Sequence, residues 1–219
     1  MSADVKPDNI FVNWARDHQG NKTVTDAALG DFGVAFRQQA GPPLRTAHPV
    51  GNFMWRSPEG QTASGVTKAS DVFSYGLVVR QIQPAWIITP AELSCVSRQC
   101  IYALGGGDLL LLEDERVLAE LAAAGIAPHE DILVRHFTYF GLANEGLLEQ
   151  VDGHAHNTLK KASAIAERAV EHQPELRFEA WGKDLGESAL EMISGMTRPD
   201  PAVRLTIEEV LESPWWREP

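Results

Sequence analysis

The chain has 219 residues, of which 44% are hydrophobic, and its formal net charge is −11, from 30 acidic against 19 basic side chains. A chain of this length and composition can bury one sizeable core and does not require a second domain. The acidic balance, without a cluster of Lys and Arg that could follow a phosphate backbone, argues against nucleic acid as a partner.

No apolar run reaches the roughly 18 residues that a membrane-spanning helix needs, and no charged and then apolar leader opens the sequence. We therefore expect no membrane partner and a cytoplasmic or nuclear location. Cys95 and Cys100 form no metal-binding spacing with the seven histidines, so we interpret them as free thiols. His154 and His156 lie in a polar stretch and are interpreted as solvated side chains rather than metal ligands.

The chain opens with a polar loop, Asp-Val-Lys-Pro-Asp-Asn at residues 4–9, and Asp-Phe-Gly follows at residues 31–33. Between them, residues 10–14 and 24–29 are apolar or β-branched, which predicts two short strands. The polar stretch 15–23, with Gln-Gly-Asn at its tip, predicts a long connecting loop. The sequence therefore predicts a β-hairpin with a polar loop at each of its two ends.

An irregular segment is predicted after the hairpin, because residues 34–56 show little periodicity and contain Gly-Pro-Pro. Met-Trp-Arg-Ser-Pro-Glu closes this segment at residues 54–59. Ser-Asp-Val-Phe-Ser-Tyr-Gly follows at residues 70–76. From Asp71 onward the apolar residues are dense enough to predict a helix that is buried on most sides.

Pro84 and Pro90 interrupt this helical pattern. Residues 100–105 nevertheless have the apolar run and the terminal glycine expected of the second half of the helix. Joining the two halves directly would give one continuous apolar helix. We therefore hypothesise that residues 79–99, whose codons keep the reading frame, are a retained intron; a genuine loop of this protein is the alternative.

Helical periodicity marks residues 109–124, 157–172, 185–196 and 207–211, and in part residues 131–150. Thr206 and Glu209 predict a capping box at the start of the last of these helices. The three glycines at 105–107 have no Lys-Ser or Lys-Thr after them, so we interpret them as a helix stop rather than a phosphate-binding loop.

Near the end of the chain, Asp-Pro-Ala-Val-Arg-Leu-Thr at residues 200–206 and Ser-Pro-Trp-Trp at residues 213–216 complete a series of motifs. The series resembles, in its order, the catalytic loop, metal-binding loop, activation-segment end, buried-helix start and closing elements of a eukaryotic protein kinase domain. Ser57 stands where the family has Ala, and Phe73 where it has Trp. In overall style the chain is similar to divergent Ser/Thr kinase-like proteins of filamentous fungi.

The resemblance implies a mainly α fold, the protein kinase-like C-terminal lobe with a small β-hairpin. The N-terminal lobe is absent from this sequence, since the catalytic loop begins at residue 4 and no Gly-rich loop, strand lysine or helix glutamate precedes it. We expect one partial kinase domain over 1–219, with catalytic and metal-binding loops in 1–33, an activation segment in 34–59, and a helical lobe in 60–219 that contains the insertion.

The resemblance also assigns roles to four polar residues of the two loops. Asp4 would orient or deprotonate a substrate hydroxyl, and Lys6 would neutralise charge on the transferred phosphoryl group. Asn9 and Asp31 would hold Mg²⁺ and, through it, ATP. Ser2-Ala3 replaces the usual His-Arg before the catalytic aspartate, so activation by loop phosphorylation is not expected.

Five further residues match structural positions of the family. Phe32 and Gly33 complete the metal-binding loop. Glu59 and Arg204 match a buried ion pair that braces the activation segment, and Asp71 matches a residue that hydrogen-bonds the catalytic-loop backbone. These residues set geometry rather than chemistry.

Three functions fit these patterns. The first is a Ser/Thr protein kinase that acts on a protein hydroxyl in its full-length form, this fragment being inactive alone; Lys two residues after Asp4 is typical of Ser/Thr-directed members. The second is a pseudokinase-like protein-interaction module. The third is a small-molecule phosphotransferase, which is disfavoured because Ser-Pro-Glu and Asp-Pro-x-x-Arg belong to the platform for peptide substrates. The four polar residues favour an enzyme.

Overall fold

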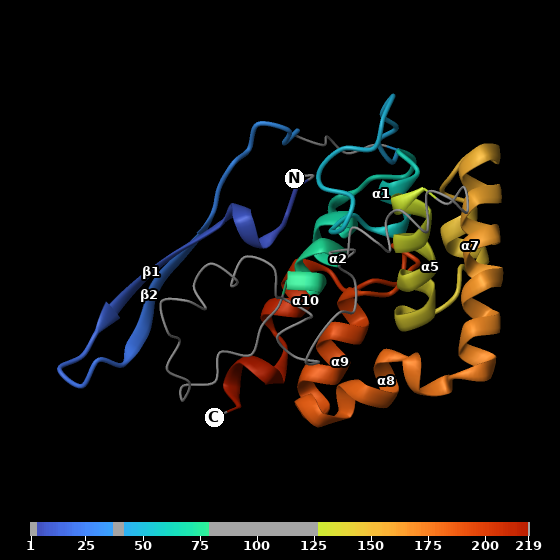
Figure 1. Cartoon of the computed structure of the whole chain (residues 1–219). Coiled ribbons are helices and arrows are strands. Elements are labelled where there is room, and N and C mark those ends of the chain that lie inside the picture. Colours follow the sequence, from blue (N-terminus) through green and yellow to red (C-terminus); the bar gives the residue numbers. More distant parts are fainter. Residues whose placement is uncertain (1–3, 37–41, 79–126, 219) are drawn as a thin grey trace.

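The computed structural model describes residues 4–36, 42–78 and 127–218 of the chain. Within these ranges, a two-stranded hairpin projects from a body made of helices (Figure 1). The hypothesised insertion at 79–99 lies outside the described residues. So do the expected second half of its helix, the glycine cluster and the expected helix at 109–124. No described helix is long and apolar enough to cross a membrane.

The hairpin consists of β1 (Ile10–Arg16) and β2 (Lys22–Leu29), which pair antiparallel. Both strands extend further toward the tip than the sequence predicted, and the connecting turn is correspondingly shorter. Asp17 explains the difference, because its Oδ1 accepts hydrogen bonds from the backbone N–H groups of Gln19, at 2.8 Å, and Asn21, at 2.9 Å. Such a side-chain-closed turn lets the strands pair almost to its edge.

One short helix, α1 (Pro58–Gln61), precedes the first long helix of the body. Ser57 caps α1, its hydroxyl accepting a hydrogen bond from the N–H of Gly60. The next helix, α2 (Lys68–Val78), begins earlier than expected from the apolar pattern. Its start is set by Thr67, whose hydroxyl accepts from the N–H of Ala69 at 3.2 Å.

The C-terminal half of the body is helical. Its helices are α5 (Pro128–Phe140), α6 (Glu145–Leu148), α7 (Gly153–His172), η3 (Pro174–Leu176), α8 (Phe178–Trp181), η4 (Gly182–Leu185), α9 (Glu187–Met196), α10 (Ile207–Leu211) and η5 (Pro214–Arg217). The partly helical stretch 131–150 is two helices, and α10 has the predicted bounds. The predicted capping box is confirmed, with Thr206 and Glu209 exchanging hydrogen bonds of 2.7 and 3.2 Å.

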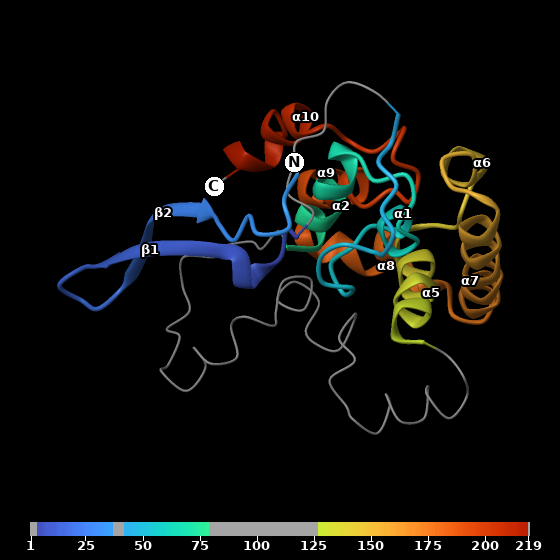
Figure 2. The ribbon, with the colours of Figure 1, turned by 90° about the horizontal axis from the view of Figure 1, so that it is seen from above.

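The buried apolar side chains form two clusters. One surrounds α2 and α9 and includes Phe73, Leu77 and Met196, all fully buried. The other lies between α5 and α7, which Figure 2 shows side by side at the edge of the body. Gly76 lets α2 approach α9 closely, because a Cβ at this position would lie 2.9 Å from the Cβ of Met196.

A buried ion pair joins α1 to the segment that precedes α10. Arg204 Nη1 lies 2.9 Å from Glu59 Oε1, and Nη2 lies 3.2 Å from Oε2, with both side chains fully buried. Ser70 donates a further hydrogen bond to Glu59 Oε1 at 2.8 Å. The remaining Arg204 donors bind backbone carbonyls, of Ala69, Arg198 and Pro199. Because every charged atom has partners, the pair can stay buried.

Replacing Glu59 with Gln should destabilise the fold by about 3–5 kcal/mol, because the Arg204 guanidinium would stay buried without a counter-charge. The control is Arg45→Gln, which breaks the exposed ion pair between Arg45 and Asp152 at 3.2 Å and should cost about 1 kcal/mol or less. Urea unfolding of both variants measures the difference. Equal losses in the two variants would contradict the structural role of the buried pair.

His136 on α5 is fully buried in the same region, with its ring 5.0 Å from that of Phe73 in an edge-on arrangement. Neither ring nitrogen has a hydrogen-bond partner among the described residues. Burial, assisted by the nearby charge of Arg204, lowers the pKa of His136 from 6.5 to about 3. The native state therefore holds this imidazole neutral at every mildly acidic pH.

This depressed pKa makes stability depend on pH. The unfolded chain protonates His136 below about pH 6.5, whereas the folded chain does not, so stability is complete above that pH and falls as the pH drops toward 3. We expect a loss of about 2 kcal/mol between pH 7 and pH 5 from this group. Urea unfolding across that interval should show a flatter profile for His136→Phe, while exposed His154→Gln retains the slope. Parallel profiles for all three proteins would refute the assignment.

Candidate functional site

The predicted metal ligands come together where the hairpin joins the body. The short 3₁₀ turn η1 (Pro7–Asn9) leads directly into β1, and Asp31 follows two residues after β2. Ile10 pairs with Leu29, and the Asn9 carbonyl accepts a hydrogen bond from the N–H of Gly30 at 2.8 Å. Antiparallel pairing thus brings the two polar loops to the same end of the hairpin, whereas the sequence predicted one at each of its two ends.

Asp4 lies almost buried beside Asn9, and its carboxylate is held by three donors. Asn9 Nδ2 donates to Oδ2 at 3.1 Å and also to the Asp4 carbonyl at 2.9 Å. Lys6 Nζ lies 2.8 Å from the same Oδ2. The backbone N–H of Asn52 donates to Oδ1 at 2.8 Å. The structure therefore brings Asp4, Lys6 and Asn9 into one hydrogen-bonded group, closed by a residue from the segment before α1.

The surroundings of Asp4 decide its charge. Burial by itself raises the pKa of this carboxyl, but the hydrogen bonds from Lys6, Asn52 and Asn9, together with the Lys6 charge, outweigh burial and hold the pKa below its usual range. Asp4 is consequently ionised at neutral pH. A carboxylate with a low pKa is a weak base and a good hydrogen-bond acceptor, which suits orienting a hydroxyl better than fully deprotonating it.

Asp31 and its neighbours are exposed, in contrast to Asp4. Asp31 has a positive φ of 53°, a conformation that Asp tolerates better than most residues. Phe32 is 58% exposed and lies outside the described core. The N–H of Ala35 donates to the Phe32 carbonyl at 3.0 Å, so a tight turn passes through Gly33. Asp31 therefore sits on an exposed turn, directly after Gly30, whose N–H binds the Asn9 carbonyl.

The donor set at this end of the hairpin fits a hard divalent cation. Asn9 Nδ2 donates to Asp4, so the amide oxygen is the atom with which Asn9 could bind a metal, and Asp31 supplies a carboxylate. Mg²⁺ prefers such oxygen ligands and keeps waters or substrate phosphates for the rest of its coordination. No group of three or more His, Cys, Asp or Glu side chains arranged for a metal occurs among the described residues, and Mg²⁺ of this kind needs none.

Three of the structural residues predicted from the sequence lie around the start of α2. Glu59 and Arg204 form the buried pair described above. Asp71 lies in the first turn of α2, next to Ser70, which donates to Glu59. The ion pair therefore fixes the start of α2 and the position of α1 together.

Two residues that contribute to the site carry no sequence signal for that role. Asn52 reaches Asp4 through its backbone N–H, which every residue except Pro has. Arg56 was part of a recognised motif, but its contacts are with backbone carbonyls of the same segment. The roles of these two residues follow only from the path of the backbone between residues 49 and 56.

Comparison with known proteins agrees with this geometry. Residues 1–89 match the sequence model of the protein kinase domain. The L-type lectin-domain containing receptor kinase S.1 of Arabidopsis thaliana is 35% identical over 122 residues, which are 53% of this chain and 17% of that protein. The corresponding receptor kinase SIT1 of Oryza sativa is 30% identical over 102 residues, 45% of this chain and 14% of its own length.

A bacterial relative and a solved structure extend the comparison. The serine/threonine-protein kinase PrkC of Bacillus subtilis is 33% identical over 79 residues, 36% of this chain and 11% of that protein. The crystal structure of a kinase domain superposes with a TM-score of 0.53 at 18% identity, covering 97% of this chain and 58% of the other. These relatives are plant and bacterial, so the similarity to fungal proteins stays a prediction.

Residues 1–89 thus match the protein kinase domain. The described residues have a kinase-like fold, mainly helical with one antiparallel hairpin. The chain spans less than a fifth of the curated relatives it matches, 17% of the first.

Proposed function

We propose that this chain is the C-terminal-lobe portion of a Ser/Thr protein kinase that transfers the γ-phosphoryl group of ATP to a hydroxyl of a protein substrate. The observation that carries the proposal is the group formed by Asp4, Lys6 and Asn9. An ionised, nearly buried carboxylate lies 2.8 Å from a lysine ammonium, and an asparagine holds it from the side that leads to Asp31. Phosphoryl transfer needs these components in close proximity.

Each residue then has one role. Asp4 accepts the hydrogen bond of the substrate hydroxyl and aligns its oxygen for attack. Lys6, held by Asp4, places a positive charge where the transferred group gains negative charge. Asn9 and Asp31 would hold Mg²⁺, which supplies charge neutralisation to the ATP phosphates when bound. Lys6 two residues after Asp4, and the name of the bacterial relative, support Ser and Thr as acceptors.

The test joins this chain to a kinase N-terminal lobe that carries the Gly-rich loop and the strand lysine. Asp4→Asn should reduce phosphate transfer to a Ser/Thr peptide by about 10² to 10⁴-fold, and Asp31→Ala should abolish it because a metal ligand is lost. The matched control is Asp8→Asn, an exposed carboxylate in the same loop, which should leave the rate unchanged. Wild-type rates for Asp4→Asn would refute the proposed role.

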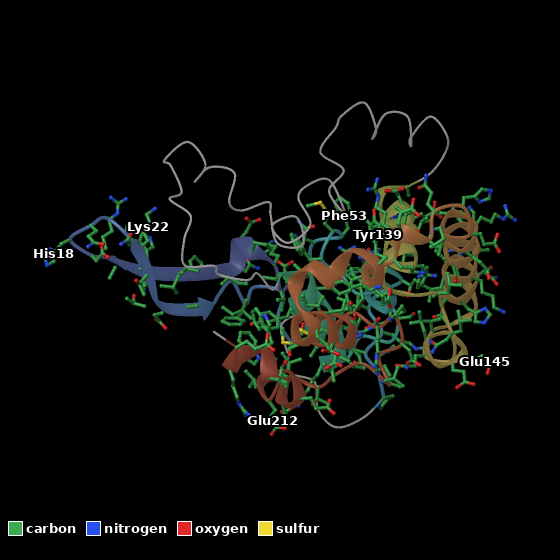
Figure 3. All side chains as sticks on the ribbon, turned by 90° about the horizontal axis from the view of Figure 1, so that it is seen from below. His18, Lys22, Phe53, Tyr139, Glu145 and Glu212 are labelled. Carbon is green, nitrogen blue, oxygen red and sulfur yellow. The ribbon has the colours of Figure 1, made fainter. Side chains whose placement is uncertain are left out.

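The exposed hairpin supports a second candidate, a protein-interaction module. Val12, Trp14 and Val24 lie on one face of the hairpin and are 46%, 48% and 43% exposed. Arg16 Cζ and Lys22 Nζ lie 5.2 and 4.8 Å from the centroid of the Trp14 ring. Two cations therefore border the apolar face at Trp14. Figure 3 shows Lys22 on the projecting hairpin, far from Tyr139 in the body. Exposed apolar faces of this kind mark interaction sites.

If the hairpin face is such a surface, it should drive association of the purified chain. Val12→Thr combined with Val24→Thr keeps β-branched residues in the strands, so unfolding should change by less than about 1 kcal/mol, while the face loses apolar area. Sedimentation velocity should show concentration-dependent association of the parent chain and a monomeric double variant. Identical sedimentation of the two proteins would remove the support for this second candidate.

A further inference from the structure

The residues 49–56, here called the Arg56 loop, fold back on the side chain of Arg56. Its Nε donates to the carbonyl of Val50 at 2.9 Å, and its Nη2 donates to the carbonyl of Pro49 at 3.2 Å and to that of Gly51. Three consecutive carbonyls can converge on one guanidinium only if the chain turns sharply. Gly51 provides the turn, with a φ of 84° that residues with a Cβ rarely adopt.

The residue after this turn is Asn52, and both of its backbone polar groups are used. Its N–H donates to Asp4 Oδ1 at 2.8 Å, and its carbonyl accepts from the N–H of Trp55 at 3.0 Å. Its side-chain oxygen accepts from the N–H of Met54, also at 3.0 Å. The side chain thus shapes the loop, while the backbone N–H reaches the carboxylate. The orientation of that N–H is set by the turn that Arg56 holds.

This contact distinguishes the two oxygens of the Asp4 carboxylate. Each carboxylate oxygen can accept about two hydrogen bonds. Oδ2 already accepts two, from Lys6 and Asn9, whereas Oδ1 accepts one from a described residue, Asn52. Oδ1 is therefore the oxygen with acceptor capacity left for a hydroxyl, and Asn52 fixes its direction.

We propose that Arg56 is a positioning residue for Asp4: by gathering the carbonyls of Pro49, Val50 and Gly51, it presents the Asn52 N–H to Oδ1 and so orients the oxygen that receives the substrate hydroxyl. The role of Asp4 toward a substrate rests on the proposed function, whereas the orientation of its carboxylate is independent of that function.

Electrostatics agree with this arrangement. Burial lowers the pKa of Arg56, and the negative charge of Asp4 acts in the opposite direction, so the two groups are within electrostatic reach. Lys6, from the same loop, is the charged group that lowers the pKa of Asp4, and the charge of Asp4 in turn acts on Arg56. An experiment must therefore separate the effect of the Arg56 charge from the effect of its hydrogen bonds to the three carbonyls.

The experiment is native-state hydrogen exchange of the Asn52 amide in the full 219-residue chain, with Asp4→Asn as the reference for loss of the charged acceptor. Arg56→Lys keeps the positive charge but lacks the planar fork that spans several carbonyls. Gly51→Ala changes no charge and disfavours the left-handed turn. Arg45→Lys, at an exposed arginine of the same segment, is the matched control.

Both test variants should speed exchange of the Asn52 amide by about tenfold or more, because its hydrogen bond to the charged carboxylate is lost, and the control should not. Values equal to the parent's in both variants would overturn the proposal. If Arg56→Lys does not fold, Gly51→Ala decides alone. Hydrogen exchange needs no catalysis, so an inactive kinase would contradict the proposed function and leave this result standing, and the reverse also holds.

Discussion

The buried ion pair between Glu59 and Arg204 is the interaction on which the rest of the described structure depends. It connects residues 145 positions apart in sequence, and its hydrogen bonds reach the start of α2 and the chain before α10. A fully buried pair adds little net stability when it is complete, but it leaves a strong penalty for any arrangement that separates the charges. It therefore selects one placement of α1 and, through α1, of the loop that precedes it.

Only a few successive contacts connect this ion pair to Asp4. Ser57 caps α1 two residues before Glu59, and Arg56 is the residue before Ser57. Arg56 holds the carbonyls that precede Asn52, and Asn52 donates to Asp4. On the other side, the hairpin pins Asn9 through the hydrogen bond from Gly30. The Asp4 carboxylate is thus oriented by two elements that come from opposite sides, and neither element needs a ligand to be in place.

Much of this arrangement could be predicted from local sequence. Apolar and β-branched residues on either side of a Gln-Gly-Asn turn predicted the hairpin. The two polar loops were expected at opposite ends of it, whereas antiparallel pairing brings Asn9 and Asp31 to one end. Thr206 and Glu209 gave the helix start at α10. The contacts that could not be predicted use groups without residue-specific signals: the Asn52 backbone N–H, the carbonyls around Arg56, and the burial of His136, which depends on packing between distant helices. The strand ends were misplaced because Asp17 closes the turn with its side chain.

We infer that the Arg56 loop and the ion-pair region belong to one cooperative unit that keeps Asp4 oriented. Native-state hydrogen exchange of the Asn52 amide tests it most directly. We predict that this amide exchanges with the same opening free energy as core amides of α2, such as those of Phe73 and Leu77. Exchange of the Asn52 amide at the rate of an exposed loop, with the α2 amides still protected, would show that the loop opens independently and would refute this coupling.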